Sequence, residues 1–249
     1  MSEQKKVLTR RDFLVSAGGA AAGVALASTG LGILTPKAGA AGVALPEYPW
    51  VEYFTEPLDV EAVRQLGVQY YNEGNGCSEG AFRALLTELG EPFNQVPSQI
   101  LHFGKGGGVG WATLCGAVNG SAAAVSLVFG RGQATTAIVN ELMGWYSQTA
   151  LPLSADVRSV AGNPLCHASV SNWVKASGKK ASERGPRCGA ITGDTAAQAA
   201  LYMNQVLAGT FVPAFEMSEE TKACMECHVG GFVDDTLGKM DCKGCHEGH

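Results

Sequence analysis

The chain ends in two copies of the pattern Cys-x-x-Cys-His, CMECH at residues 224–228 and CKGCH at residues 242–246. Two thiols at this spacing fit one helical turn, so both can form thioethers with the vinyl groups of one haem, and the histidine that follows reaches the iron as proximal ligand. The surrounding segment, residues 216–249, has few large apolar side chains and cannot build a core alone. Bound groups must therefore organise it.

A zinc site is the competing interpretation of the two cysteine pairs, because two CxxC pairs this close together resemble a zinc ribbon. A histidine directly after both pairs is not expected by chance in a chain that has five histidines among 249 residues. We therefore predict two covalently bound haem c groups. The thioether cysteines are Cys224, Cys227, Cys242 and Cys245, and the proximal ligands are His228 and His246.

Each CxxCH motif supplies one axial ligand, so each iron needs a second ligand from elsewhere. The remaining histidines, His102, His167 and His249, are the candidates for the two distal positions. His102 lies beside the glycine-rich sequence FGKGGGVG, which permits the close approach of a planar group. Met217 and Met240 are the alternatives, and methionine ligation would raise the haem potential relative to bis-histidine ligation.

The N-terminal region has the features of an export signal. TRRDFLV at residues 9–15 is a twin-arginine pattern, and residues 13–35 form a charge-free stretch rich in Ala and Gly. Ala38-Gly39-Ala40 then provides a small-x-small cleavage site. We predict a twin-arginine signal peptide over residues 1–40, cleaved after Ala40, and a mature protein in the periplasm. An uncleaved membrane anchor is the alternative, since the stretch is long enough to span a bilayer.

Composition excludes several classes of protein. Acidic residues outnumber basic ones by 23 to 18, which argues against a nucleic-acid partner. With 46% hydrophobic and 16% charged residues, the chain can build a core and is neither disordered nor fibrous. A second uncharged run, residues 106–130, contains polar side chains among Gly and Ala, so we expect it in a protein core. The mature chain is therefore expected to have no membrane span.

Apolar residues recur at helical spacing through the middle of the chain, whereas the alternating pattern of strands is nearly absent. The predicted helices cover residues 59–71, 77–89, 109–128, 133–149, 164–176 and 194–208. The expected fold class is mainly α, a compact helical domain with a short irregular C-terminal dihaem-binding tail. The predicted organisation is a signal peptide (1–40), an extended N-terminal arm (41–58), the helical domain (59–215) and the tail (216–249).

The other four cysteines, Cys77, Cys115, Cys166 and Cys188, are spread over the helical domain, each near a predicted helix start or a glycine. Four thiolates, with backbone N–H groups of glycine-rich turns bonded to the sulfurs, suit an iron–sulfur cluster. Two structural disulfides and buried free thiols are the alternatives. The twin-arginine route carries folded proteins, which favours a cofactor inserted before export. We therefore expect an iron–sulfur cluster, of the [2Fe–2S] type, at these cysteines.

Several sequences of the helical domain, NGCSEGAF, GGGVGWATLCGAVNGSAAAVSLVFG, PLCHASV and RCGAITG, are similar to the family named for its pattern Cys, Gly-Cys-Ala-x-x-Gly, Cys, Cys. The Gly-Cys-Ala-x-x-Gly part of this pattern reads Gly76-Cys77-Ser78-Glu79-Gly80-Ala81 here, and it departs from the pattern at Ser78 and Ala81. With the twin-arginine leader and the double CxxCH, most of residues 60–249 resembles the split-Soret cytochrome c family. The resemblance implies a dimeric, bis-histidine dihaem electron carrier of anaerobic sulfate-reducing bacteria, with an iron–sulfur site in the helical domain.

Two functions are compatible with these features. One is the transfer of single electrons between periplasmic redox partner proteins, and the other is a small multihaem reductase with one open haem position. Enough histidines exist to close both irons, which favours electron transfer without catalysis. We also predict a homodimer, because a short tail cannot cover two large apolar macrocycles and exposed haem edges promote association.

The first prediction concerns haem attachment. The intact mass of the mature protein should exceed that of the chain beginning at Ala41 by two haem groups, because each CxxCH motif binds one haem through two thioethers. Mass spectrometry of protein made in a host with a c-type haem attachment system measures this directly. A mass with one haem or none would contradict the assignment of both motifs.

Overall fold

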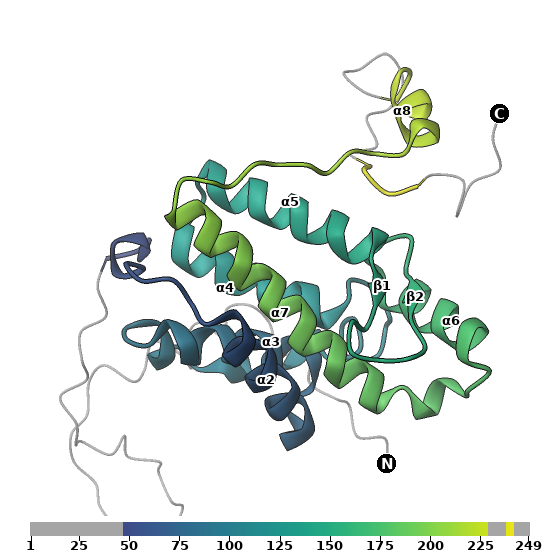
Figure 1. Cartoon of the computed structure of the whole chain (residues 1–249), viewed down its shortest axis with the longest axis horizontal. Helices are drawn as coiled ribbons and strands as arrows, with labels where there is room; N and C mark the ends of the chain where they lie inside the picture. Colours follow the sequence, from purple (N-terminus) through teal and green to yellow (C-terminus); the bar gives the residue numbers. More distant parts are fainter. Residues whose placement is uncertain (1–46, 229–237, 242–249) are drawn as a thin grey trace, which may run out of the picture. The chain divides into compact units, whose positions relative to one another are not determined.

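The computed structural model describes residues 47–228 and 238–241 (Figure 1). The predicted signal peptide with its cleavage site after Ala40, the second CxxCH motif (Cys242, Cys245, His246) and His249 lie outside these residues. The described chain is mainly helical, which confirms the predicted fold class. Within it, one two-stranded antiparallel sheet pairs β1 (Ala150–Leu151) with β2 (Ser159–Val160), and an isolated antiparallel bridge joins Leu114 to Leu165.

Six helices form the body: α2 (Val60–Tyr70), α3 (Gly76–Leu89), α4 (Gly116–Phe129), α5 (Gln133–Gln148), α6 (Cys166–Ser177) and α7 (Gly185–Leu207). Shorter turns are η2 (Val51–Tyr53), η3 (Tyr71–Asn75), η4 (Phe93–Gln95), η5 (Ser98–Gly104) and η6 (Ala181–Glu183), and α8 (Glu219–Met225) lies in the tail. The long helix α7 packs along α2, α3 and α4, and α5 packs on α4 (Figure 1).

Local sequence sets most helix ends. The Asp59 side chain accepts hydrogen bonds from two first-turn amides of α2, and the pyrrolidine ring of Pro186 lies in the first turn of α7. The helices α3 and α4 end at Gly90 and Gly130, whose φ angles of 71° and 66° favour glycine. These signals explain why the predicted helices at 59–71, 77–89, 133–149 and 164–176 agree with the structure to within two residues.

The core lies between α2, α3, α4, α5 and α7. Its buried side chains include Val63, Phe82, Leu85, Val125, Ile138, Leu142 and Met203, together with Ala196, Ala199 and Ala200 of α7. From the N-terminal segment, Trp50, Phe54 and Leu58 are also buried in this core. Asn204 fixes the end of that segment, because its amide donates to the Leu58 carbonyl at 2.9 Å and accepts from the Leu58 amide at 2.8 Å.

The helix predicted over 109–128 begins only at Gly116, so the prediction for residues 109–115 was wrong. The residues before it form a glycine-rich loop, residues 103–112. Within this loop Gly106, Gly107, Gly108 and Gly110 have φ between 66° and 92°, which a right-handed helix cannot accommodate. The uncharged stretch of residues 106–130 is therefore divided between this loop and the buried helix α4.

The last helix of the body was predicted too short, because α7 begins at Gly185 and not near Asp194. Its first turns have small residues in place of a periodic apolar stripe, so hydrophobic spacing did not indicate a helix there. The small residues have a packing role. A Cβ on Gly67 of α2 would lie 2.8 Å from the Cα of Gly193, and one on Gly193 would collide with the Arg64 carbonyl oxygen.

None of the helices in residues 47–228 and 238–241 combines the length and the apolar composition needed to cross a bilayer.

The second prediction concerns this close contact. Gly193→Ala should lower the free energy of unfolding by about 1–3 kcal/mol, because the added methyl group forces α2 and α7 apart. Denaturant unfolding followed by far-UV circular dichroism measures the change. Gly185→Ala in the first turn of the same helix is the matched control, since its Cβ meets nothing within 4 Å. Equal stability of both variants would contradict the packing argument.

Candidate functional site

Four cysteines from four different helices line one cavity of about 200 Å³. Cys77 is the second residue of α3, Cys115 is the N-cap of α4, Cys166 is the first residue of α6 and Cys188 is the fourth residue of α7. The structure therefore brings together the four cysteines that the sequence analysis grouped. In CMECH, the described motif of the tail, the cysteines do not line this cavity.

Backbone pairing draws two of these helix starts together. The Cys115 amide donates to the Pro164 carbonyl at 2.9 Å, and the Cys166 amide donates to the Thr113 carbonyl at 2.7 Å. These bonds flank an antiparallel bridge between Leu114 and Leu165. Because α4 and α6 both leave this bridge, their first cysteines lie on the same cavity wall.

Glycine next to the cavity makes room for Cys77. A Cβ on Gly116 would collide with the Cys77 sulfur, so a side chain at position 116 would displace the thiol. Before Cys77, Gly74 and Gly76 have φ of 98° and 76°, which turns the chain sharply out of η3 and into α3. The glycine directly before Cys77 is therefore explained by the backbone turn that it has to make.

All four helices lack a side-chain cap at the end that carries the cysteine. By contrast, α2 is capped by Asp59 and α8 by Ser218. The first amides of a helix need acceptors and give its N-terminus a partial positive charge. At the start of α4, the Ala117 amide bonds to the Cys115 thiol. Helix starts of this kind favour anionic sulfur ligands.

Burial raises the pKa of three of the thiols, those of Cys115, Cys166 and Cys188. Burial, followed by the negative charge of a Cys77 thiolate, raises the pKa of Cys115 to about 12. Burial, followed by the charges of Cys188 and Cys77, raises the pKa of Cys166 to about 11. Burial also raises the pKa of Cys188, against the opposing influence of the Arg187 guanidinium. A bound cation would reverse this repulsion and favour thiolates.

The rest of the cavity lining is rich in cations. Lys105, Arg184 and Arg187 contribute to it, and no Asp or Glu is among the residues that line it. Cations around a cluster of sulfur ligands balance a net negative charge. The cavity therefore suits an anionic assembly of thiolates and metal.

A hydrogen-bonded network supports one wall. The Tyr146 hydroxyl of α5 donates to Ser169 Oγ at 2.8 Å, and Arg187 Nη2 donates to the same oxygen at 2.8 Å and to the Ser169 carbonyl at 3.0 Å. Tyr146 is 1% exposed and also bonds to the Cys115 thiol. The network ties α5, α6 and α7 together behind the cysteines.

Within the described residues, no group of three or more His, Cys, Asp and Glu side chains converges closely enough to hold a single metal ion. A single tetrahedral ion would need its sulfurs at about 2.3 Å. The four thiols instead surround a wider space, and none of them forms a disulfide. The four thiols and the cation-rich lining make this cavity a candidate site for a metal–thiolate group.

In the tail, the first CxxCH motif forms a helical turn. Cys224 lies in α8, and the amides of Cys227 and His228 donate to its carbonyl at 3.3 and 3.2 Å. The root of the tail is held on α5, because the Phe215 amide donates to Glu141 Oε1 at 2.8 Å. The predicted ligands Cys242, Cys245, His246 and His249 lie outside the described residues.

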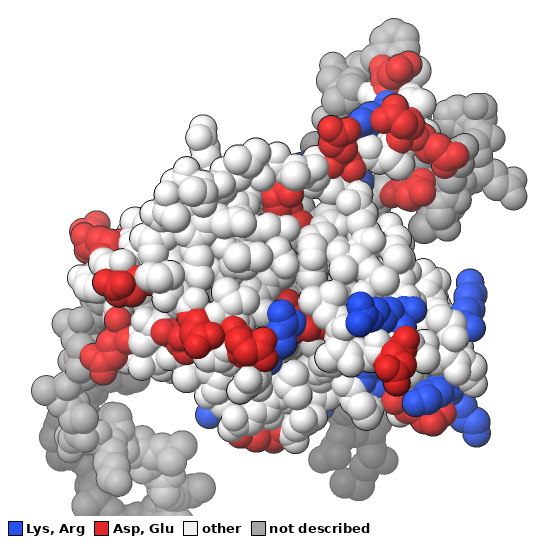
Figure 2. Space-filling view, in the orientation of Figure 1, with Lys and Arg blue, Asp and Glu red and all other residues white. Residues whose placement is uncertain are grey.

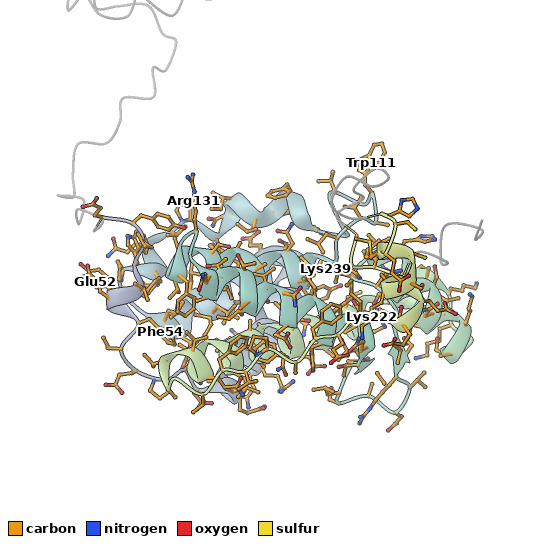
Figure 3. The ribbon with its side chains drawn as sticks, turned by 90° about the horizontal axis from the view of Figure 1, so that it is seen from above. Glu52, Phe54, Trp111, Arg131, Lys222 and Lys239 are labelled. Atoms are coloured by element: carbon orange, nitrogen blue, oxygen red, sulfur yellow. The ribbon has the colours of Figure 1, made fainter. Side chains whose placement is uncertain are left out.

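The described part of the tail is acidic. Glu216, Glu219, Glu220 and Glu226 give it a negative surface (Figure 2), which Lys222 partly offsets through bonds to Glu216 and Glu219 at 3.0 and 2.8 Å. The neighbouring Lys239 donates to Asn140 of α5 at 2.6 Å, and both lysines are labelled in Figure 3.

The two described distal-ligand candidates lie at opposite ends of the 103–112 loop. His102 directly precedes the loop, and the His167 amide donates to the Ala112 carbonyl at its end at 3.0 Å. Both histidines are exposed. The His102 ring places Nδ1 3.4 Å from Oε2 of Glu79, whose side chain is 6% exposed. This contact leaves Nε2 as the outward-facing nitrogen of His102.

The same loop is unusually apolar for a surface. Trp111 is 82% exposed and extends away from the body (Figure 3), and Phe103 and Val109 are 57% and 71% exposed. Exposed apolar groups gathered beside two exposed histidines indicate a surface that another group covers.

Several residues of the site were missed by sequence reasoning. The sequence analysis did not single out Tyr146, Ser169, Glu79 or Arg187, although Arg187 is only 7% exposed. The available signal for Arg187 was its place directly before Cys188. No sequence pattern marked Tyr146, because its role arises from the way α5 packs across the cavity.

Comparisons with known proteins give consistent results. Residues 75–202 match the family described as "Putative redox-active protein (C_GCAxxG_C_C)". The chain is 35% identical to split-Soret cytochrome c of Desulfovibrio desulfuricans over 96% of this chain and 94% of that protein. It also resembles a solved structure described as a novel iron centre in the split-Soret cytochrome c from that organism, with 35% identity and a TM-score of 0.69. That match covers 78% of this chain and 90% of the solved one.

The third prediction concerns the network behind the cysteines. Tyr146→Phe should lower the free energy of unfolding by about 1–3 kcal/mol, because it leaves the buried Ser169 hydroxyl and the Cys115 thiol with one hydrogen-bond partner fewer. Tyr48→Phe is the control, since the Tyr48 hydroxyl bonds to the Ser126 carbonyl at an exposed position and should contribute only about 0.5 kcal/mol. Chemical denaturation of the wild-type protein and of both variants measures the free energy of unfolding of each. A Tyr146 variant as stable as the control variant would contradict a structural role for the network.

Proposed function

The chain belongs to the split-Soret cytochrome c family and to the wider C_GCAxxG_C_C family, and on that premise we propose that it is a periplasmic dihaem electron carrier with an additional iron–sulfur cluster. The observation that carries the proposal is the convergence of Cys77, Cys115, Cys166 and Cys188 on one cavity of a chain that also has two CxxCH motifs. Single electrons would pass between the centres and a redox partner protein.

The haem groups bind to the tail in this proposal. Cys224 and Cys227 attach one haem and His228 is its proximal ligand, and the helical turn that joins these residues supports the assignment. The second haem binds at Cys242, Cys245 and His246 by the same pattern. When bound, each haem supplies one-electron iron chemistry. The protein attaches the haem and sets its axial ligands.

The distal ligands come from His102, with His167 or His249 at the other iron. Glu79 supports this role for His102, because a carboxylate that accepts from Nδ1 fixes the tautomer and leaves Nε2 for a metal. His167 is exposed at the other end of the same loop. Bis-histidine ligation closes both irons, which favours electron transfer over a reductase with an open position.

We propose that the active form is a homodimer. The exposed Phe103, Val109 and Trp111 form an apolar surface next to His102, and haem edges of a second copy would cover it. In this arrangement the distal histidines serve haems of the partner chain. A basic redox partner protein would dock on the acidic tail, where Glu219, Glu220 and Glu226 lie.

The cluster is proposed to be of the [2Fe–2S] type, held by the four cysteines of the body. It supplies a further one-electron centre. The wide spacing of the thiols, the uncapped starts of four helices and the cation-rich lining support it. The residues of the body hold the sulfurs, donate backbone hydrogen bonds to them and limit contact with water.

The predicted twin-arginine leader fits this division between body and tail. A cluster in the body would be inserted before export of a folded domain, and the tail would receive its haems in the periplasm after export. The same order explains why one chain contains both kinds of cysteine site.

The fourth prediction separates the two kinds of centre. Cys77→Ser, Cys115→Ser, Cys166→Ser and Cys188→Ser should each remove non-haem iron and acid-labile sulfide from anaerobically purified protein without loss of haem, because each takes one ligand from the cluster. Iron, sulfide and pyridine haemochrome analyses measure the three quantities. Cys224→Ser is the complementary variant and should disturb haem attachment while the body keeps its sulfide. Disulfides among the four body cysteines in protein kept anaerobic would contradict the cluster.

A further inference from the structure

Arg187 is a buried cation whose hydrogen bonding is incomplete. The residue is 7% exposed, and its Nη2 group is used by the carbonyl and the hydroxyl of Ser169. Its Nε has no hydrogen-bond acceptor among the described residues. A buried donor without an acceptor is costly, so such groups in native proteins usually bond to a further partner.

The surroundings of Arg187 indicate what that acceptor is. The residue lines the four-cysteine cavity, and none of the residues that line it with Arg187 is acidic. The guanidinium carbon of Arg187 lies over the Trp173 ring, 5.8 Å from the ring centroid. The missing partner is therefore an anionic sulfur group inside the cavity.

We propose that Arg187 is a positioning residue of the cluster, donating through Nε to a sulfur of the iron–sulfur assembly while Ser169 holds the other end of its guanidinium. The inference rests on the proposed cluster and adds a residue that sets its potential. Hydrogen bonds and positive charge at the sulfurs stabilise the more negative, reduced state. Arg187 therefore raises the reduction potential of the cluster.

Arg184 provides the contrast within the same cavity. It also lines the cavity, but its side chain is exposed and Nη1 donates to the Ala181 carbonyl at 2.8 Å. Water screens an exposed cation, so its effect on a buried cluster is smaller. The two arginines have the same charge and differ in burial and in their free donor.

The test uses the full holoprotein with Arg187→Lys and Arg187→Met, and Arg184→Met as matched control. The cluster potential is measured by redox titration followed by electron paramagnetic resonance. Arg187→Met should shift the cluster potential to more negative values. Arg187→Lys should give a smaller shift in the same direction, because lysine keeps the charge but lacks the planar donor group. The haem potentials and the Arg184→Met cluster should change little.

A second variant covers the case in which Arg187→Met does not fold. Ser169→Ala removes one acceptor of Arg187 but keeps the guanidinium. It therefore measures the effect on stability of losing this hydrogen bond while the Nε donor is still present. An unchanged cluster potential and an unchanged resonance signal in Arg187→Lys, with full iron content, would contradict the proposed role of Arg187 without contradicting the cluster. Wild-type protein without non-haem iron would overturn the proposed cluster itself.

Discussion

The starts of four helices meet around four thiols, and much of the described structure depends on this convergence. Cys77, Cys115, Cys166 and Cys188 come from α3, α4, α6 and α7, and none of these helices has a side-chain cap where it meets the cavity. Buried thiols that repel one another as thiolates, beside amides without side-chain acceptors, are unfavourable for the protein alone. A metal–sulfur group would offset both costs, so we expect the body to be most stable with its cluster bound.

Helix α5 connects the two regions that we assign to redox centres. Tyr146 contributes to the cavity wall, while Glu141 of the same helix accepts from the Phe215 amide at the root of the tail. The Phe215 ring also occupies the space in which a side chain at Gly144 would lie. A single rigid helix thus contacts the proposed cluster site and the segment leading to CMECH. This arrangement favours a fixed path between the centres over a freely tethered tail.

Sequence reasoning grouped the four body cysteines that the structure brings to one cavity, but it predicted less of the geometry around them. Helices with clear caps or an apolar stripe were predicted closely, since Asp59 and Gly90 mark their ends locally. The start of the helix predicted at residue 109 was wrong, because the Gly and Ala content of the sequence does not reveal the positive φ angles of Val109, Gly110 and Ala112. The cavity depends on the bridge between Leu114 and Leu165, which is a long-range contact without a local signal. The buried state of Arg187 follows from the same packing.

The central claim is that one chain holds six-coordinate haems in its tail and an iron–sulfur cluster in its body. Electron paramagnetic resonance of wild-type protein, purified without oxygen and titrated from the oxidised to the reduced state, tests it most directly. The account predicts low-spin ferric haem signals in the oxidised protein and a separate iron–sulfur signal on reduction. A high-spin ferric signal of full intensity, or the absence of any non-haem signal at every potential, would contradict it.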